Sequence, residues 1–491
     1  MISSKLYIRS FLGIIALVGV VACSDPWDDH TNKVDQNLTQ NLTERIENTS
    51  QTSEFGKLLT ETGLDGVLAG SKTHTVWAPN NDAMAQVNPE LLSDLAKKRL
   101  FVRNHIALTA FSSVTEADTV TVQMLSNKYY QFKNGTVMAE SNVVTADQYA
   151  SNGLFHIISA AIEPKQNIWQ YINSLSGSNA MSDYLLSLKQ FDLYRSDSIA
   201  KANEPEIHEL YADSLKNSYL HNVYNLNNEK NKYTFFLLKD GAFNDEVEKL
   251  KPYLIKGTVE SDSTTTYASY FATRDLAFHK AVARENLPDT LVSSFGVKVP
   301  INEDNIVEDI ILSNGIVYVM DTMDVPLETR LLTTQIEGEE PIGFSENVRS
   351  NTLYREKDDP DGVFFNDIMV LNHGTPELAI NYNIGRNIYS TTYEVYWRAV
   401  NDRQNNTFKQ RLRIGGTIMP DGTVENPVAF LEGQDGTGIE VNPDVYDDVF
   451  VGEFTLEEAR AYMLSLVAAN TGSNGENTLT LDYLKLVPLI K

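Results

Sequence analysis

The chain has 491 residues, which is too long for one hydrophobic core and corresponds to about three domains of ordinary size. Hydrophobic residues make up 42% of it and aromatic residues 10%, the composition of a globular protein rather than a disordered one. The formal net charge is −26, which excludes nucleic acid as an expected partner, because phosphate binding needs a cationic surface. The same charge disfavours adsorption to anionic lipid head groups and is typical of a soluble, diffusely acidic surface.

Residues 1–22 predict a signal peptide. Lys5 and Arg9 precede an apolar run from Phe11 to Val21, which is shorter than the roughly 20 residues that a membrane span needs. The run ends in Val-Val-Ala-Cys23, and Cys23 is the only cysteine of the chain. This ending resembles the bacterial lipobox, in which the thiol receives a diacylglyceryl group and the signal peptide is cut before the cysteine. The alternative is an ordinary secretory signal with a chance cysteine.

Residues 23–36 are expected to form a lipidated linker, because they are polar and follow the predicted anchor. Acyl chains on Cys23 would attach the protein stably, and no later stretch is long and apolar enough to cross a bilayer. The run Ser24-Asp-Pro-Trp-Asp-Asp29 resembles the surface-export signal of Bacteroidetes lipoproteins, although a solvated tether would have the same composition. The expected location is the outer membrane, lipid-anchored and facing the cell exterior.

Residues 37–164 predict a first domain that mixes helices and strands. A helical face at residues 55–64 is followed by His74–Pro79, a short β-branched and aromatic run that predicts a strand ended by proline. Asn80 or Asn81 suits a helix N-cap, and a second helix is expected from Pro89 to about Ala107. The turn Lys133-Asn-Gly135 predicts a hairpin between residues 129–132 and 136–138, because Asn-Gly accepts positive φ.

Three motifs of this domain resemble the fasciclin family. His74-Thr-Val-Trp-Ala-Pro-Asn-Asn-Asp-Ala-Met84 resembles its first motif, and Asn104-His105 falls where the helix before the β-wedge usually carries such a pair. Asn152-Gly-x-x-His156-Ile-Ile158 resembles its second motif, while Ser159 stands where many members have aspartate. The resemblance implies extracellular adhesion or ligand capture without chemistry. His156 is expected to be a hydrogen-bonded core histidine that ties strand to helix, since no metal-binding or catalytic partner is in view.

Residues 165–329 predict a second, divergent copy. Lys232–Phe243 repeats the strand, polar turn and apolar residue of the first motif, and Ser313–Asp321 repeats the second. Tyr318 stands where the first copy has His156. Asp275–His279 is expected to be the mid-domain helix. A helical insertion is expected between residues 185 and 231, with Ile207, Leu210, Tyr211 and Leu215 on one face, for packing or as a binding surface.

Residues 330–491 predict an antiparallel, jelly-roll-like β-sandwich, because short alternating runs are separated by turn residues. A short helix is expected at Leu456–Ala468. The run Thr478–Pro488 resembles the last strand of jelly-roll carbohydrate-binding modules and the β-sandwich tail of Bacteroidetes surface proteins. The predicted fold class is therefore α+β, with two tandem fasciclin-like domains of β-wedge plus helices ahead of the sandwich.

The sandwich supplies the candidate site residues. In the strand Thr391–Ala399, one face carries Tyr393, Val395 and Trp397 and the other carries Tyr396 and Arg398, and one of these faces must be core. Exposed aromatic rings would stack on sugars and arginine would bond hydroxyls, so the candidate ligand-binding residues are Trp397, Tyr393, Tyr396 and Arg398; the alternative places Trp397 in the core. The candidate Ca²⁺ ligands are Asp358, Asp359 and Asp361, with Asp444, Asp447 and Asp448 as a second set and a metal-free acidic turn as the alternative.

The sequence lacks a G-x-S-x-G elbow, a P-loop and a G-x-G-x-x-G motif, and acylation of Cys23 would remove cysteine catalysis, so a non-enzymatic protein is expected with no required cofactor. Its 66 acidic residues leave a glycosidase carboxylate pair open. The leading hypothesis is a surface lipoprotein that captures extracellular glycan, as part of an outer-membrane importer complex. The alternatives are an adhesin that contacts a surface protein through its fasciclin domains and a structural accessory subunit.

Overall fold

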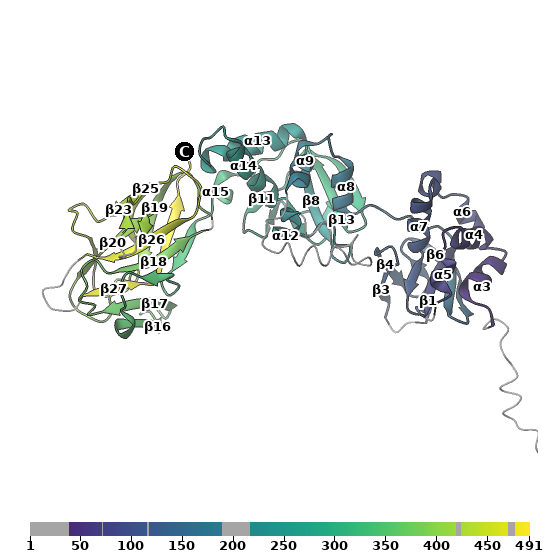
Figure 1. Ribbon diagram of the computed structural model, residues 1–491, viewed down its shortest axis with the longest axis horizontal. Coiled ribbons are helices and arrows are strands. Elements are labelled where there is room, and N and C mark those ends of the chain that lie inside the picture. The colour runs from purple at the N-terminus through teal and green to yellow at the C-terminus, as the bar shows by residue number, and fades with distance from the viewer. Residues whose placement is uncertain are drawn as a thin grey trace, which may run out of the picture. The chain divides into compact units, whose positions relative to one another are not determined.

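The computed structural model describes residues 39–70, 72–114, 117–188, 217–385, 387–418, 424–469 and 477–491 (Figure 1). The chain divides into two compact units, one up to Gln166 and one from Asn167 to Lys491. The signal peptide, Cys23, the linker and the apolar face at residues 207–215 lie outside the described residues and stay predictions. In the part of the chain that the structure describes, no helix has the length and apolarity of a membrane span.

The first unit is built around one mixed sheet, with strand order β2-β1-β7-β6-β5-β4-β3. The strands are β1 (His74–Pro79), β2 (Ile106–Leu108), β3 (Thr119–Gln123), β4 (Tyr129–Lys133), β5 (Val137–Met138), β6 (Ser141–Ala150) and β7 (Gly153–Ile158). The helices are α3 (Leu42–Asn48), α4 (Ser53–Glu61), α5 (Asp65–Leu68), α6 (Asn81–Met84), the 3₁₀ turn η2 (Pro89–Leu92) and α7 (Leu95–Arg103). Among the strands β2-β1-β7-β6, the two central ones, β1 and β7, pair in parallel. We call this unit the first wedge.

Local signals predicted much of the first wedge. Asn80 caps α6 by accepting the N–H of Ala83 at 2.8 Å, and the hairpin β4–β5 turns through Asn134 and Gly135, both at positive φ. The single helix expected over residues 89–107 is wrong. It is broken after η2, because the Asp94 side chain accepts the N–H of Lys97 at 2.8 Å and starts a new helix there.

The second unit opens with a domain of the same plan, which we call the second wedge. Its four-stranded sheet has the order β12-β13-β8-β9, and β10 pairs with β11 beside it. The strands are β8 (Tyr233–Leu238), β9 (Ala277–His279), β10 (Thr290–Val292), β11 (Lys298–Pro300), β12 (Ile306–Leu312) and β13 (Gly315–Met320). The helices are α8 (Ile168–Ser174), α9 (Ala180–Ser187), α12 (Ser218–Asn222), α13 (Asp240–Leu250), α14 (Asp262–Arg274) and α15 (Leu327–Arg330), with 3₁₀ turns at Lys251–Tyr253, Arg284–Asn286 and Glu303–Asn305.

The two wedges share hydrogen bonds as well as topology. β13 pairs in parallel with β8 as β7 does with β1. Just before each of these strands, an asparagine side chain accepts the N–H of the first residue of a helix: Asn152 from Leu42 and Asn314 from Ile168, both at 2.9 Å. The two wedges therefore share this strand pairing and this asparagine contact.

The glycine of each repeated motif is required by backbone contact. Gly153 has φ +155° and Gly315 has φ +156°, a region that L side chains rarely adopt. A Cβ would lie 2.1 Å from the carbonyl oxygen of His74 in the first wedge and 2.0 Å from that of Tyr233 in the second. Only glycine therefore allows the parallel strand to start this close to its neighbour.

One element of the repeat was predicted wrongly. Asp275–His279 was expected to be the mid-domain helix, but α14 ends at Arg274, and residues 277–279 form β9 against β8. This segment has the place of Asn104–Leu108 in the first wedge, where a helix also ends and an edge strand begins. The apolar spacing was that of a strand entering the sheet edge.

The sandwich follows at residues 334–491 and contains three main sheets. Their orders are β14-β28-β19-β25, β15-β18-β26-β20-β23 and β16-β17-β27, and β27 continues into β28 across Asp482. The strands are β14 (Thr334–Glu337), β15 (Gly343–Phe344), β16 (Thr352–Asp358), β17 (Phe364–Leu371), β18 (Ala379–Ile384), β19 (Thr392–Arg398), β20 (Phe408–Ile414), β23 (Ala429–Leu431), β24 (Ile439–Val441), β25 (Val449–Thr455), β26 (Tyr462–Ala468), β27 (Thr478–Leu481) and β28 (Tyr483–Pro488), with a small pair β21 (Thr417–Ile418) and β22 (Val424–Glu425). Inward side chains of all three main sheets share one core cluster.

The helix expected at Leu456–Ala468 is absent from this described segment. Residues 462–468 form β26, which lies between β18 and β20 and pairs with both. Leu464, Leu466 and Val467 are fully buried. A central strand covered on both faces reads as a continuous apolar run, so its sequence lacks the alternation that would have distinguished it from a helix.

The second wedge and the sandwich form one compact unit with a bonded junction. The Ser390 N–H donates to the carbonyl of Tyr253 at 2.7 Å, and the Ala459 N–H donates to that of Ile255 at 2.9 Å. Apolar side chains of both domains belong to the same core cluster. Two loops of the sandwich are therefore hydrogen-bonded to the segment after α13, one to the 3₁₀ turn Lys251–Tyr253 and one to Ile255.

Candidate ligand-binding face of the sandwich

Strand β19 separates the predicted site residues onto two faces. Tyr393, Val395 and Trp397 point into the core and are at most 1% exposed, while Tyr396 lies on the outer face and is partly exposed. Tyr393 also donates its hydroxyl to the carbonyl of Tyr389 at 3.2 Å. The prediction that Tyr393 and Trp397 bind ligand is therefore wrong, because their rings are packed between the sheets and unable to meet a sugar.

Aromatic side chains gather on the outer face of the β14-β28-β19-β25 sheet. Tyr396 is opposite Phe450 on β25, with ring centroids 5.5 Å apart in an edge-to-face arrangement, and opposite Lys485 on β28. Phe450 is 51% exposed. Lys485 lies over the ring of Tyr483 on the same strand, 4.7 Å from its centroid. We call these four residues, Tyr396, Phe450, Tyr483 and Lys485, the aromatic face.

Hydrogen bonds hold the polar ends of this face. The Tyr396 hydroxyl donates to Glu394 at 3.0 Å, and the hydrogen bond to this carboxylate raises the pKa of Tyr396, so the hydroxyl stays neutral. The Tyr483 hydroxyl and the Lys485 ammonium donate to the two oxygens of Asp448 at 2.6 and 2.7 Å. The hydrogen bond to Asp448 raises the pKa of Lys485, which keeps its charge. The face thus combines fixed rings with polar groups whose ionisation is set.

Arg398 shares this side of β19 but is not available to a ligand. Its guanidinium donates to Asp482 at 3.0 Å, to Asp359 at 2.8 Å and to the carbonyl of Tyr446 at 2.6 Å. It also lies over the ring of Phe365. Only 7% of Arg398 is exposed, so its predicted role in bonding sugar hydroxyls is wrong, and the side chain instead joins strands and loops.

The predicted calcium ligands do not converge. Asp359 is paired with Arg398, and its other oxygen accepts the N–H groups of Asp361 and Val363 at 3.0 and 2.8 Å, while Asp358 lies at the end of β16. No group of three acidic, histidine or cysteine side chains suited to a metal occurs among the described residues, which include Asp444, Asp447 and Asp448. The Asp358, Asp359 and Asp361 metal site is therefore wrong: the sequence forms an Asx-type turn whose charge is met by arginine.

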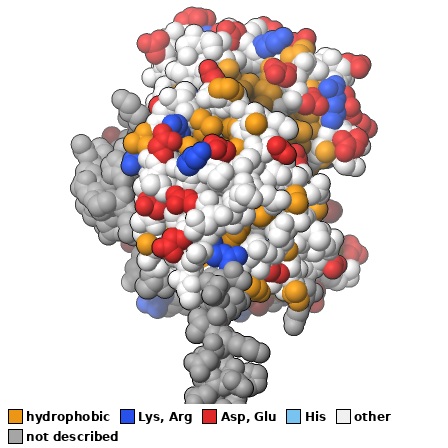
Figure 2. Space-filling model, turned by 90° about the vertical axis from the view of Figure 1, so that its right-hand side faces the viewer, with side chains coloured by type: hydrophobic (Ala, Val, Ile, Leu, Met, Phe, Trp, Pro, Cys, Tyr) orange, Lys and Arg blue, Asp and Glu red, His pale blue; other side chains and the backbone are white. Residues whose placement is uncertain are grey.

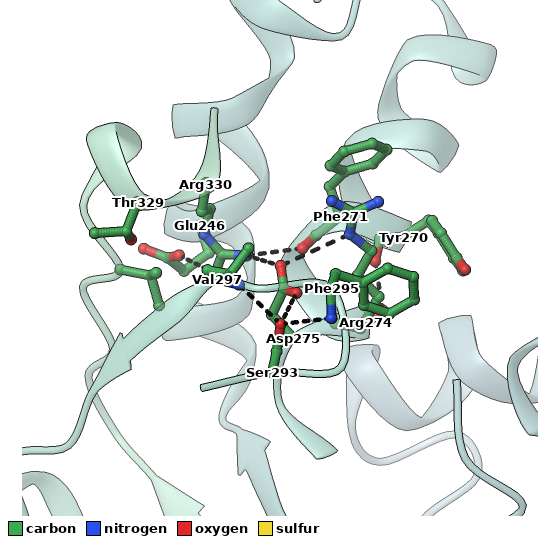
Figure 3. Close-up of polar contacts among 12 residues, drawn as sticks. Glu246, Tyr270, Phe271, Arg274, Asp275, Ser293, Phe295, Val297, Thr329 and Arg330 are labelled. Atoms are coloured by element: carbon green, nitrogen blue, oxygen red, sulfur yellow. Dashed lines mark hydrogen bonds and ion pairs between the residues drawn. The ribbon is translucent and has the colours of Figure 1, made fainter. Parts of the chain in front are cut away.

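A second cluster of charged residues lies inside the second wedge (Figure 3). Arg330 donates to Glu246 at 2.7 Å, to Asp275 at 3.2 Å and to the carbonyl of Phe271 at 2.7 Å. Arg330, Glu246 and Asp275 are each 1% exposed. Because these charges are paired and buried, this cluster offers no surface to a ligand, and removing one partner would leave a buried charge poorly compensated.

His156, in the second motif of the first wedge, has the expected structural role with different partners. His156 accepts the N–H of Asp147 at Nδ1 and donates from Nε2 to the carbonyl of Phe111 at 2.8 Å. Burial lowers its pKa, so the ring is neutral. Tyr318 donates to the carbonyl of Val282 at 2.8 Å in the second wedge. Both side chains hold a loop rather than a helix.

Sequence reasoning found Tyr396 and missed Phe450 and Tyr483. Phe450 lies in Val449–Val451, where apolar residues occupy both faces, and a register shift beside Tyr396 hides the alternation. Tyr483 alternates correctly with Leu484 and Lys485 in β28, so its outward position was predictable. On the face in view in Figure 2, acidic side chains are scattered among uncharged and hydrophobic ones, as expected for a diffuse charge of −26.

Comparisons with known proteins identify the first domain. Residues 50–164 match the family model of the Fasciclin domain, and no curated protein matches the chain. Among solved structures, the chain is similar to a FAS1 domain pair from the insect cell adhesion molecule Fasciclin I, with 16% identity over 58% of this chain and 99% of that one and a TM-score of 0.22.

Two carbohydrate-binding modules are also similar. One is a family 35 module from Clostridium thermocellum, with 12% identity over 32% of this chain and 99% of that one and a TM-score of 0.21. The other is a CBM36 module in complex with calcium and xylotriose, with 10% identity over 31% of this chain and 98% of that one and a TM-score of 0.20. TM-scores of this size carry no argument, so the assignment rests on the family model, which matches a Fasciclin domain at residues 50–164 of the first wedge.

Proposed function

We propose that this protein is a non-enzymatic surface lipoprotein whose sandwich captures extracellular glycan for a nutrient-uptake system. In this proposal Cys23 carries the lipid at the outer membrane, and the two wedges, the second as a divergent fasciclin domain, act as spacer and platform. The importer complex would then receive the captured glycan. The observation that carries the proposal is the aromatic face of the sandwich.

The chemistry of that face suits sugars. Pyranose rings present apolar C–H faces and hydroxyl edges, which match partly exposed aromatic rings beside carboxylate and ammonium groups. Tyr396 and Phe450 supply adjoining rings, and Lys485 with Asp448 supplies a donor and an acceptor pair. A nucleic acid would meet Asp448, Glu394 and Glu453 on the same sheet, and its phosphates would be repelled.

A glycan array tests this proposal with the soluble chain that begins at Ser24. We expect binding to at least one class of polysaccharide, and Tyr396→Ala or Phe450→Ala should weaken it at least tenfold through loss of stacking. Tyr149→Ala is the matched control, since Tyr149 is 51% exposed on β6 of the first wedge. Full binding by the Tyr396 and Phe450 variants would exclude the aromatic face as the site.

An adhesin is the second candidate, and the fasciclin family match of residues 50–164 favours it. Its outcome in the same experiment is different: the soluble chain would bind cell-surface protein, and removal of the first wedge would abolish that binding. Metabolic labelling with palmitate tests the anchor for either candidate. Label that persists in Cys23→Ser would exclude lipidation at this position.

A further inference from the structure

The sandwich is open along one edge. β15 is the last strand of its sheet and β16 is the last strand of the β16-β17-β27 sheet, and residues 345–351 connect the two. A hollow of about 490 Å³ at this edge is lined by Phe344, Glu346, Asn347, Val348, Arg349, Thr352 and Tyr354, of which only Val348 is buried. Ligand sites in proteins commonly have volumes of about 300–1,000 Å³, so the hollow is large enough for one or two sugar rings.

Two aromatic side chains, Phe344 and Tyr354, line the hollow at an edge that a protein normally protects. Tyr354 is 59% exposed, although Ile368, its partner on β17, is fully buried in the core. Val348 is only 5% exposed. Exposed edge strands usually carry charge or are covered, and β16 follows this rule at Glu356, Lys357 and Asp358 but not at Tyr354. On β16 the exposed ring of Tyr354 therefore lies beside the buried Val348 and ahead of the charged end of the strand.

We infer that this hollow is a second glycan subsite, which holds a terminal pyranose residue while the aromatic face binds the chain of the same or another glycan. A ring in the hollow would stack on Tyr354, and its hydroxyls would reach Glu346 and Arg349. The inference rests on the proposed function for the kind of ligand. The hollow differs from the aromatic face in place, because that face lies on the outer surface of one sheet and the hollow lies at the edge of the sandwich.

Two subsites on one domain give a measurable consequence. A polysaccharide that reaches both gains avidity over a monosaccharide, and the dependence of small-glycoside binding on Tyr354 reports on the hollow. The probe is therefore a panel of methyl hexopyranosides and methyl hexopyranuronates, measured by saturation-transfer NMR on the soluble chain that begins at Ser24. We expect at least one glycoside to bind with millimolar affinity.

Variants assign the binding site. Tyr354→Ala should lower glycoside affinity at least tenfold and Arg349→Ala severalfold. Phe364→Ala is the matched control, because Phe364 is 60% exposed on the neighbouring strand β17 and outside the hollow. Tyr354 is exposed, so its replacement should leave the melting temperature within a few degrees of the unsubstituted chain, which circular dichroism checks.

The outcomes separate this inference from the proposed function. If no glycoside binds, or if Tyr354→Ala binds like the unsubstituted chain, the hollow is not a glycan subsite, even where binding of polysaccharide through Tyr396 persists. If glycosides bind through Tyr354 while the array shows no dependence on Tyr396 or Phe450, the hollow stands and the aromatic face fails.

Discussion

Asn104 in the first wedge and Asp275 in the second occupy the same position, at the end of the helix that enters the edge strand. Each accepts a serine hydroxyl at 2.7 Å, from Ser126 and Ser293 respectively. Asn104 then donates its amide to the carbonyl of Ile162 at 2.7 Å, so its site is neutral. The carboxylate of Asp275 has no proton to donate and is met by a guanidinium instead.

That one exchange changes the surroundings of the second wedge. Arg330 bonds Asp275 and brings in Glu246, whose second oxygen is paired with Lys249. Arg330 also lies at the junction with the sandwich, where its carbonyl accepts the hydroxyl of Tyr389 at 3.1 Å. The first wedge thus fills this position with a local amide network, and the second fills it with a charged network that reaches the sandwich.

The largest effects are expected from substitution of the two glycines that the wedges share. Gly153→Ala and Gly315→Ala should each cost at least about 4 kcal/mol of unfolding free energy, because strain at this φ adds to a carbonyl clash. Gly66→Ala in α5 and Gly241→Ala in α13 are controls, since an added Cβ there meets nothing within 4 Å. Hydrogen exchange should show loss of protection in the first unit for Gly153→Ala and in the second for Gly315→Ala. A mild effect of either variant would break the equivalence.

Exchanging the polar residues tests the difference between the wedges. Arg330→Met removes the guanidinium shared by two buried carboxylates, which leaves Glu246 with Lys249 alone and Asp275 with the more distant Arg274, and should cost about 3–5 kcal/mol in the second unit. Asn104→Asp places a buried carboxylate in the first wedge without a cation and should cost about 2–4 kcal/mol, whereas Asp275→Asn should cost less, since Arg330 keeps Glu246. Denaturant unfolding measures these values. An Asn104→Asp variant as stable as the original chain would show that the first site accepts charge without compensation.

These charge pairs were beyond sequence reasoning for a physical reason. Glu246 and Arg330 are 84 residues apart and meet only after α13 and α15 have packed, and no local pattern encodes that contact. Asn152-Gly153 and Asn314-Gly315 were found because backbone geometry demands these residue types within a few positions. Local constraints leave a signature in the sequence, and pairings made by packing leave little.

The same limit governed the candidate site. The alternation of β19 predicted that Tyr393 and Trp397 share one face and Tyr396 the other, and this is confirmed. Which face is core depends on where the facing sheet lies, since Tyr393 packs on Phe454 with stacked rings 5.3 Å apart. Alternation therefore fixed the partition of the residues, while the assignment of the inner face needed the fold.

Lowering the pH should change the free energy of unfolding of the two units in opposite directions, by less than the glycine substitutions do. His105 of the first wedge donates from Nδ1 to Phe101 and accepts the N–H of Ile162 at Nε2, both at 2.9 Å, and burial lowers its pKa to about 4. The neutral ring therefore stabilises the first unit above pH 6.5, and this contribution is lost as the pH falls toward 4. Leu276 takes this position in the second wedge, since its carbonyl accepts the Phe236 N–H as His105 does that of Trp77.

The sandwich should respond in the reverse direction, because burial raises the pKa of Asp482 to about 7. A raised carboxyl pKa stabilises the fold at low pH, and that contribution is lost as the pH rises from about 4 through 7. Calorimetry between pH 7 and 4 should then show the His105 contribution to the first unit falling by about 3 kcal/mol in free energy at most, while the Asp482 contribution to the second unit rises. His105→Gln, which keeps a donor and an acceptor without titrating, should flatten the first slope, and Asp482→Asn the second. Parallel slopes in the unsubstituted chain would show that neither buried group controls the response to acid.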